Sequence, residues 1–162
     1  TCAIHRFLKD WSVSAGLTCP VPDRFYRDTA WLPPGRFTFC TATDGNHGRG
    51  VAWTAKKLRQ NAVIFMPSSS VAARVDNIRA EGARVILVDG TYDEAVSRCS
   101  REAAAEGWQI ISDTSWPGYE DIPRDVAGKQ AEHPDVAIRI APYLGAAEGV
   151  VPLLLAAASA PR

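Results

Sequence analysis

The feature that most constrains the fold is an alternation of short apolar runs and helical patterns in the middle of the chain. Four runs start about 23 to 25 residues apart, at residues 37–41, 62–66, 85–88 and 108–111. Continuous apolar runs of this length are typical of strands buried on both faces. Strand and helix in repetition predict a three-layer α/β fold, in which helices flank a mostly parallel, four-stranded sheet with right-handed crossovers.

Helical periodicity fills the gaps between these runs. Residues 47–59, 71–80 and 91–106 each place apolar side chains on one side of a helix. Gly82 and Gly107 follow the second and third of these patterns, where helix C-caps are expected. These positions define the expected ends of two helices.

Two flanks border this region. Before it, Ile4, Phe7, Leu8 and Trp11 share one face of a possible helix, and four prolines make residues 18–35 irregular. After residue 126 the pattern predicts a loop, a strand at 136–140 and a short Ala-rich helix. We therefore expect three parts: an N-terminal flank at 1–35, an α/β domain at 36–126 and a C-terminal flank at 127–162.

Composition narrows the class of protein. With 18 basic and 18 acidic residues the chain carries no net charge, so nothing favours nucleic acid or an anionic membrane as a partner. Its apolar stretches fall far short of the roughly 20 residues of a membrane span. The four cysteines are scattered, which favours a reducing cytoplasm and no metal site, and Cys40 and Cys99 fit buried positions. A chain without an initiator Met suggests a processed, excised or truncated product.

The segments that follow the predicted strands contain the candidate site. In an open parallel sheet, ligands bind beyond the carboxyl ends of the strands. After the first strand comes the loop 43–48, Thr-Asp-Gly-Asn-His-Gly, and after the fourth comes 112–116, Ser-Asp-Thr-Ser-Trp. Gly45 and Gly48 allow a close backbone approach to a ligand, and Asp44 can hold or remove a proton. The alternative is an ordinary helix start in which Asp44 or Asn46 is the N-cap.

Other polar residues have structural interpretations. We expect His47 to open a helix and not to bind a metal ion. Residues 68–70, all serines, are expected to cap the helix that begins near Val71, and Asp89 to cap or close a turn with Gly90. The remaining expectations are that Trp53 and Trp116 serve packing, and that Arg74 and Asp76 lie on the solvated side of a helix.

A family resemblance sharpens this interpretation. The loop and its continuation to residue 53, followed in order by 61–64, 66–67, 74–76, 82–83, 113–116, 118–119 and 122–123, resemble diaminopropionate ammonia-lyase. That enzyme depends on pyridoxal phosphate (PLP) and has the tryptophan-synthase-β-like fold. The resemblance covers roughly 90 residues and implies that the α/β domain corresponds to the small domain of that fold.

The resemblance also implies roles for particular residues. Asn46 would lie against the pyridoxal ring and contact its phenolic oxygen, with Gly45, His47 and Gly48 completing the cofactor loop. Asp44 and Asp113 would act as bases at the substrate Cα, on different sides. An intact relative would be a cytoplasmic homodimer that takes a small amino acid, 2,3-diaminopropionate, and releases pyruvate and ammonia.

The chain departs from the family pattern at both ends. The family's cofactor-anchoring lysine stands upstream in an Asn-Ala-Phe-Lys motif, whereas the only upstream lysine is Lys9, in a context that does not match. The glycine-rich phosphate loop is not found, and the pattern stops after Val126. We therefore expect a partial lyase that is inactive alone and self-associates through exposed apolar surface. The alternatives are a non-catalytic domain that binds a small anion or a partner chain, and another ammonia-lyase or dehydratase of the same fold.

Overall fold

A computed structural model describes residues 2–20 and 24–112 of the chain. The described elements, in chain order, are α1 Cys2–Ser14, β1 Thr38–Ala42, α2 Asn46–Lys57, β2 Asn61–Pro67, α3 Ala72–Ala80, β3 Arg84–Val88, α4 Tyr92–Glu106 and β4 Gln109–Ile110. The four strands form one parallel sheet in the order β3-β2-β1-β4. The predicted α/β class and parallel sheet are confirmed. The predicted strand at 136–140, the C-terminal helix and Trp116 lie outside the described residues.

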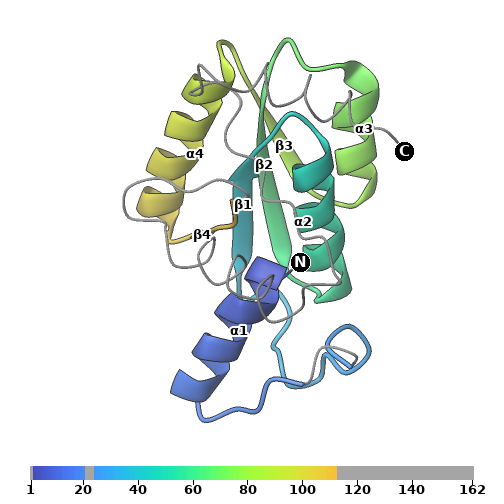
Figure 1. Ribbon diagram of the computed structural model, residues 1–162, viewed down its shortest axis with the longest axis vertical. Coiled ribbons are helices and arrows are strands. Elements are labelled where there is room, and N and C mark those ends of the chain that lie inside the picture. Colours follow the sequence, from blue (N-terminus) through green and yellow to red (C-terminus); the bar gives the residue numbers. More distant parts are fainter. Residues whose placement is uncertain (1, 21–23, 113–162) are drawn as a thin grey trace, which may run out of the picture. The chain divides into compact units, whose positions relative to one another are not determined.

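The strand order explains which helices cover which face of the sheet. From β1 the chain steps to β2 and then β3 in one direction, through α2 and α3, and these two helices lie on one side of the sheet (Figure 1). From β3 the chain returns across the sheet to β4, beyond β1, and α4 lies on the other side (Figure 1). Right-handed crossovers require this arrangement, because reversing the direction of travel moves the connecting helix to the opposite face.

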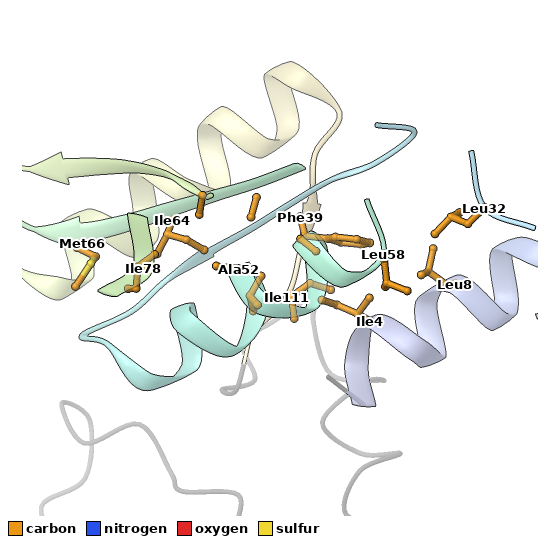
Figure 2. Packing of buried hydrophobic residues seen from close by; sticks show 14 of the residues in the cluster. Ile4, Leu8, Leu32, Phe39, Ala52, Leu58, Ile64, Met66, Ile78 and Ile111 are labelled. Carbon is orange, nitrogen blue, oxygen red and sulfur yellow. The ribbon is translucent and has the colours of Figure 1, made fainter. Parts of the chain in front are cut away.

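Two apolar cores result, one on each face of the sheet. Alternating residues of β2 separate them: Ile64 and Met66 face α2 and α3, whereas Val63 and Phe65 face α4. Figure 2 shows Ile64 and Met66 in the first core, near Ile78 of α3. Full burial of such a side chain contributes roughly 1.5–3 kcal/mol, so both faces of the central strands stabilise the fold. Cys40 and Cys99 are both buried in the second core, as predicted.

The segment before β1 packs into the first of these cores. Ile4 and Leu8 of α1 are fully buried in it, which confirms the predicted helix face. Phe7 and Trp11 place their rings edge-on to Phe37, with centroids 5.2 and 5.0 Å away. Across the described residues, no helix is long and apolar enough to cross a membrane. The division of the chain at residues 35 and 126 stays a prediction.

Two expected helix caps are not formed: the serine cap of α3, and the cap that was one of the two roles expected for Asp89. The serines 68–70 do not cap α3: Val71 occupies its N-cap position, and no side chain caps the helix. The Ser70 N–H instead donates to the Pro67 carbonyl, so these serines form a turn that ends before the helix begins. At α4 the cap is Thr91 and not Asp89, because Thr91 is the residue that the Glu94 side chain can reach to complete a capping box.

Candidate functional site

The strand order creates a switch point between β1 and β4. The connection that leaves β1 runs to β2 on one side, whereas β4 pairs with β1 on the other side and is reached through α4 on the opposite face. In open α/β sheets, ligands bind at the carboxyl ends of the strands at such a point. β1 ends at Ala42 and β4 at Ile110, so the loop 43–48 follows one of these strands and residues 111–116 follow the other. Asp113 itself lies outside the described residues.

The start of α2 is organised by a buried hydroxyl. Thr43 is 4% exposed, and its Oγ1 accepts hydrogen bonds from the backbone N–H groups of Gly45, at 3.0 Å, and Gly48, at 3.2 Å. Gly45 holds the N-cap position, so the N-cap residue itself supplies no side-chain hydrogen bond. The alternative with Asp44 or Asn46 as the cap is therefore wrong. Thr43 performs this role because it stands at the end of β1, directly beneath the first turn of α2.

The two loop glycines permit close packing on opposite sides of the loop. A Cβ at position 48 would overlap Thr43 Cγ2 and lie 2.9 Å from Ile64 Cγ2, so the helix start lies directly against the sheet. A Cβ at position 45 would lie 3.1 Å from Arg74 Cδ. Gly45 also has φ 157° and ψ −82°, outside the regions that residues with a side chain occupy. Packing against Thr43 and Ile64 thus requires glycine at position 48, and the backbone conformation favours glycine at position 45.

His47 connects the two segments at the switch point. It lies in the first turn of α2, as predicted, and its Nε2 donates to the carbonyl oxygen of Ile111 over 3.0 Å. Ile111 follows β4 directly, and its side chain is fully buried (Figure 2). The imidazole therefore joins the loop after β1 to the chain after β4, two residues before Asp113. Within the described residues, no group of three or more His, Cys, Asp or Glu could hold a metal ion.

Asp44 and Asn46 present their side chains to solvent at the edge of the sheet. Both residues are exposed. Neither side chain makes a hydrogen bond or an ion pair within the described part of the chain. A carboxylate and an amide thus stand beside a helix start, with their hydrogen-bonding capacity available to a ligand.

Two contacts at this edge were not predicted from the sequence. The Arg74 guanidinium of α3 donates to the Asp44 carbonyl oxygen over 3.2 Å, and the Tyr92 hydroxyl of α4 donates to the Ala42 carbonyl oxygen over 3.4 Å. Arg74 and Asp76 are both exposed, as predicted, but Arg74 reaches back to the loop. Tyr92 is the first residue of α4, and no pattern in the sequence indicates that its hydroxyl meets the end of β1.

The basic residues near α2 make structural contacts. Arg49 lies 3.5 Å from a carboxylate oxygen of Glu81, whose side chain is only 15% exposed, and Lys56 lies 3.6 Å from the other oxygen. Lys57 places its ammonium 5.7 Å from the ring centroid of Trp53. Trp53 is 38% exposed and meets the Tyr26 ring edge-on, which agrees with its expected packing role. These contacts join α2 to α3 and to the preceding segment.

The fold and the loop define the class of protein. Residues 27–151 match the family model described as pyridoxal-phosphate dependent enzyme, and the chain belongs to this family. Within it, the chain is a partial match to diaminopropionate ammonia-lyase. It is 47% identical over 103 residues to that enzyme of Escherichia coli strain K12, covering 64% of this chain and 26% of the relative. Identity to the Salmonella typhimurium enzyme is 52% over 85 residues, covering 52% and 21%.

Solved structures agree with these matches. The apo form of E. coli diaminopropionate ammonia-lyase superposes with a TM-score of 0.64 at 37% sequence identity, covering 84% of this chain and 39% of that chain. The chain spans about a quarter of the length of the curated relatives it matches. The E. coli threonine dehydratase IlvA is 32% identical over 89 residues, which cover 55% of this chain and 16% of the relative.

Proposed function

We propose that this chain is part of a PLP-dependent ammonia-lyase of the diaminopropionate type and carries one half of its active site. The whole enzyme would eliminate ammonia from 2,3-diaminopropionate and yield pyruvate and ammonia. One observation carries the proposal: the loop that contains Asp44 and Asn46 begins α2 at the switch point, where His47 of this loop hydrogen-bonds to the Ile111 carbonyl after β4. The match to diaminopropionate ammonia-lyases supports the choice of substrate class.

The proposed roles follow from what each side chain can do. Asn46, exposed in the first turn of α2, would contact the cofactor ring, and Gly45, His47 and Gly48 would shape the surface beneath it. Bound PLP supplies an electron sink that makes the Cα proton of an amino acid removable. Asp44 would accept that proton from one stereoisomer and Asp113 from the other, since a positioned carboxylate is a suitable general base.

The described residues fit one face of the cofactor but not its covalent anchor. The described lysines are Lys9, exposed on α1; Lys56, which also donates to the Ala80 carbonyl; and Lys57, which lies over Trp53. Activation of the substrate in this class of reaction depends on a lysine amine. We therefore propose that the chain alone does not turn over substrate, and that the whole enzyme, a cytoplasmic homodimer, completes the site with residues outside the described part of this chain.

A spectroscopic titration tests the proposal. PLP is added to the full chain while its absorbance and fluorescence are recorded, and pyruvate is then assayed with D- and L-2,3-diaminopropionate. We expect weak, saturable PLP binding and no pyruvate. Asn46→Ala should weaken binding, whereas Asn77→Ala, an exposed residue of α3, is the matched control and should not. An unperturbed PLP spectrum at saturating protein, or equal binding by both variants, would contradict the proposal.

The placement of the described lysines also favours a second candidate. The domain could be non-catalytic and bind a small anionic ligand or a partner chain at the same loop. Calorimetry with inorganic phosphate and with amino acids separates these possibilities. Binding of phosphate that PLP does not compete with would support the second candidate. The identity to threonine dehydratase favours a third, another ammonia-lyase or dehydratase. Substrate profiling of a full-length relative distinguishes it from the first.

A further inference from the structure

We propose that Arg74 is a positioning residue that fixes the orientation of the Asp44–Gly45 peptide. Arg74 lies in the first turn of α3, and its Nη1 donates to the Asp44 carbonyl oxygen over 3.2 Å. The contact spans 30 residues of sequence, so it ties α3 to the loop after β1. The functional part of this inference rests on the proposed function, whereas the effect of Arg74 on the loop does not.

The arginine side chain meets the loop along two parts of its length. Its aliphatic stem lies against Gly45, since a Cβ there would be 3.1 Å from Arg74 Cδ and 3.7 Å from Cγ and Nε. Its guanidinium bonds the carbonyl that immediately precedes this glycine. Because position 45 has no side chain, the Arg74 stem passes close to the backbone of the loop. Packing and a charge-assisted hydrogen bond act on the same peptide unit.

Arg74 and Thr43 hold the loop from opposite sides. The Thr43 hydroxyl binds the N–H groups of Gly45 and Gly48 from the buried side, next to the sheet. Arg74 binds the Asp44 carbonyl from the exposed side. The peptide between Asp44 and Gly45 is thus fixed at both its carbonyl and its N–H group. Its orientation decides where the Asp44 carboxylate and the Asn46 amide project, and displacement of a catalytic group by about 1 Å can cost about 100-fold in rate.

Arg79 of the same helix provides the contrast that makes this role testable. It is also exposed, but it pairs with Asp76 one turn away, at 3.5 Å, and the pair stays within α3. An exposed pair of this kind contributes little to stability. Arg79→Ala therefore removes one surface charge from α3, as Arg74→Ala does, but removes no contact to the loop.

Amide hydrogen exchange on the full chain tests the positioning role without any ligand. The informative amides are those of Gly45 and Gly48, bonded to Thr43, and of Arg49, bonded to the Gly45 carbonyl. We expect exchange of these amides to be about tenfold faster in Arg74→Ala. This factor corresponds to the loss of one hydrogen bond to a charged group. Arg74→Lys should restore part of the protection, because an ammonium can donate the same bond without the planar fork. Arg79→Ala should leave exchange unchanged.

The outcomes separate this inference from the proposed function. Equal exchange in Arg74→Ala and Arg79→Ala would overturn the positioning role, as would no recovery in Arg74→Lys. Faster exchange in Arg74→Ala, with weaker PLP binding that Arg74→Lys partly restores, supports both proposals. If exchange is faster in Arg74→Ala but the wild-type chain binds no PLP, the positioning role is retained and the proposed function is rejected. Melting temperatures of the variants check that the fold is intact, and Arg74→Met, which keeps an aliphatic stem without a hydrogen-bond donor, replaces Arg74→Ala if that variant does not fold.

Discussion

Two helices, α2 and α4, begin at the same edge of the sheet and are built differently at their first turns. α4 follows β3 and starts with a capping box, in which the Glu94 carboxylate accepts the Thr91 N–H over 2.6 Å and the Thr91 hydroxyl accepts the Glu94 N–H over 3.3 Å. α2 follows β1 and has Gly45 at its N-cap position. Its N–H groups are satisfied from below, by the hydroxyl of Thr43.

The difference decides which polar side chains are available to a ligand. At α4 the Glu94 carboxylate of the first turn is occupied by the backbone N–H of Thr91, the N-cap residue of its own helix. At α2 the buried Thr43, which follows β1, performs the capping, and the exposed Asp44 and Asn46 make no side-chain hydrogen bond within the described residues. An ordinary helix start uses its side chains for stability. At α2 the cap comes from Thr43, before the helix, so the side chains of Asp44 and Asn46 stay available to a ligand. For this reason we place the candidate site at α2 and not at α4.

The largest effect is expected where α2 is closest to the sheet. Gly48→Ala should lower the free energy of unfolding by about 2–3 kcal/mol, because the new methyl group overlaps Thr43 and approaches Ile64 in a well-packed region. Urea unfolding followed by circular dichroism measures this change. The result would show that the first turn of α2 has no room for a side chain on its buried face.

Gly50→Ala is the matched control for this substitution. Gly50 lies in the same helix, and a Cβ there would meet nothing within 4 Å. Alanine is the better helix former, so the variant should be neutral or more stable by about 0.5–1 kcal/mol. If both variants changed stability equally, the close approach of α2 to the sheet would not be the feature that distinguishes it.

A smaller loss is expected when the capping hydroxyl is removed. Thr43→Val keeps the volume of the side chain but leaves the Gly45 and Gly48 N–H groups without an acceptor. Unsatisfied donors in a protected position should cost about 1–2 kcal/mol. Urea unfolding gives the loss of stability, and amide exchange should show loss of protection at the two glycines.

Thr43→Ser provides the control, since it retains the hydroxyl and loses only a methyl group. Protection of the glycine amides should persist in this variant, even if stability falls slightly through the lost methyl group. If Thr43→Val kept both its stability and the protection of the glycine amides, the hydroxyl would not be the cap of α2. The contrast with α4 would then rest on the glycines alone.

Much of the fold was predictable because buried parallel strands and amphipathic helices have distinct periodicities. The runs at 37–41 and 62–66 lie within one residue of β1 and β2. The order of the strands was not predictable, because each strand is apolar on both faces and the pattern does not say which pairs with which. The switch point between β1 and β4, which supports the choice of the loop after β1, therefore came from the structure.

The site shows the same division between local and distant information. The loop 43–48 was identified from its glycines and polar residues, and by family resemblance. The roles of Thr43 and Arg74 were not, because they depend on contacts across a turn of chain or across 30 residues. The composition of residues 68–70 predicts that these serines cap α3, but the chain turns before α3 begins. Polar residues near a helix start indicate a cap only when the backbone places them within reach.

The smallest effect concerns pH and tests the α4 side of the comparison. The pKa of Glu94 lies below its ordinary value of 4.5, because its carboxylate accepts the Thr91 N–H and, in addition, the Thr91 hydroxyl. A carboxyl group whose pKa is lower in the folded state stabilises the fold above its unfolded pKa, and this contribution is lost as the pH falls through the folded pKa. Glu94→Gln should therefore be less stable than wild type at pH 7, and the difference should shrink as the pH falls below about 4.5.

Urea unfolding of wild type and Glu94→Gln across this pH range measures that difference. Glu106→Gln, at the last residue of α4, is the control: a carboxylate near a helix C-terminus is unfavourable, so its removal should produce no loss at pH 7. A constant difference between wild type and Glu94→Gln down to pH 3 would mean that the carboxylate is not the group that caps α4. The two helix starts would then differ in geometry but not in electrostatics.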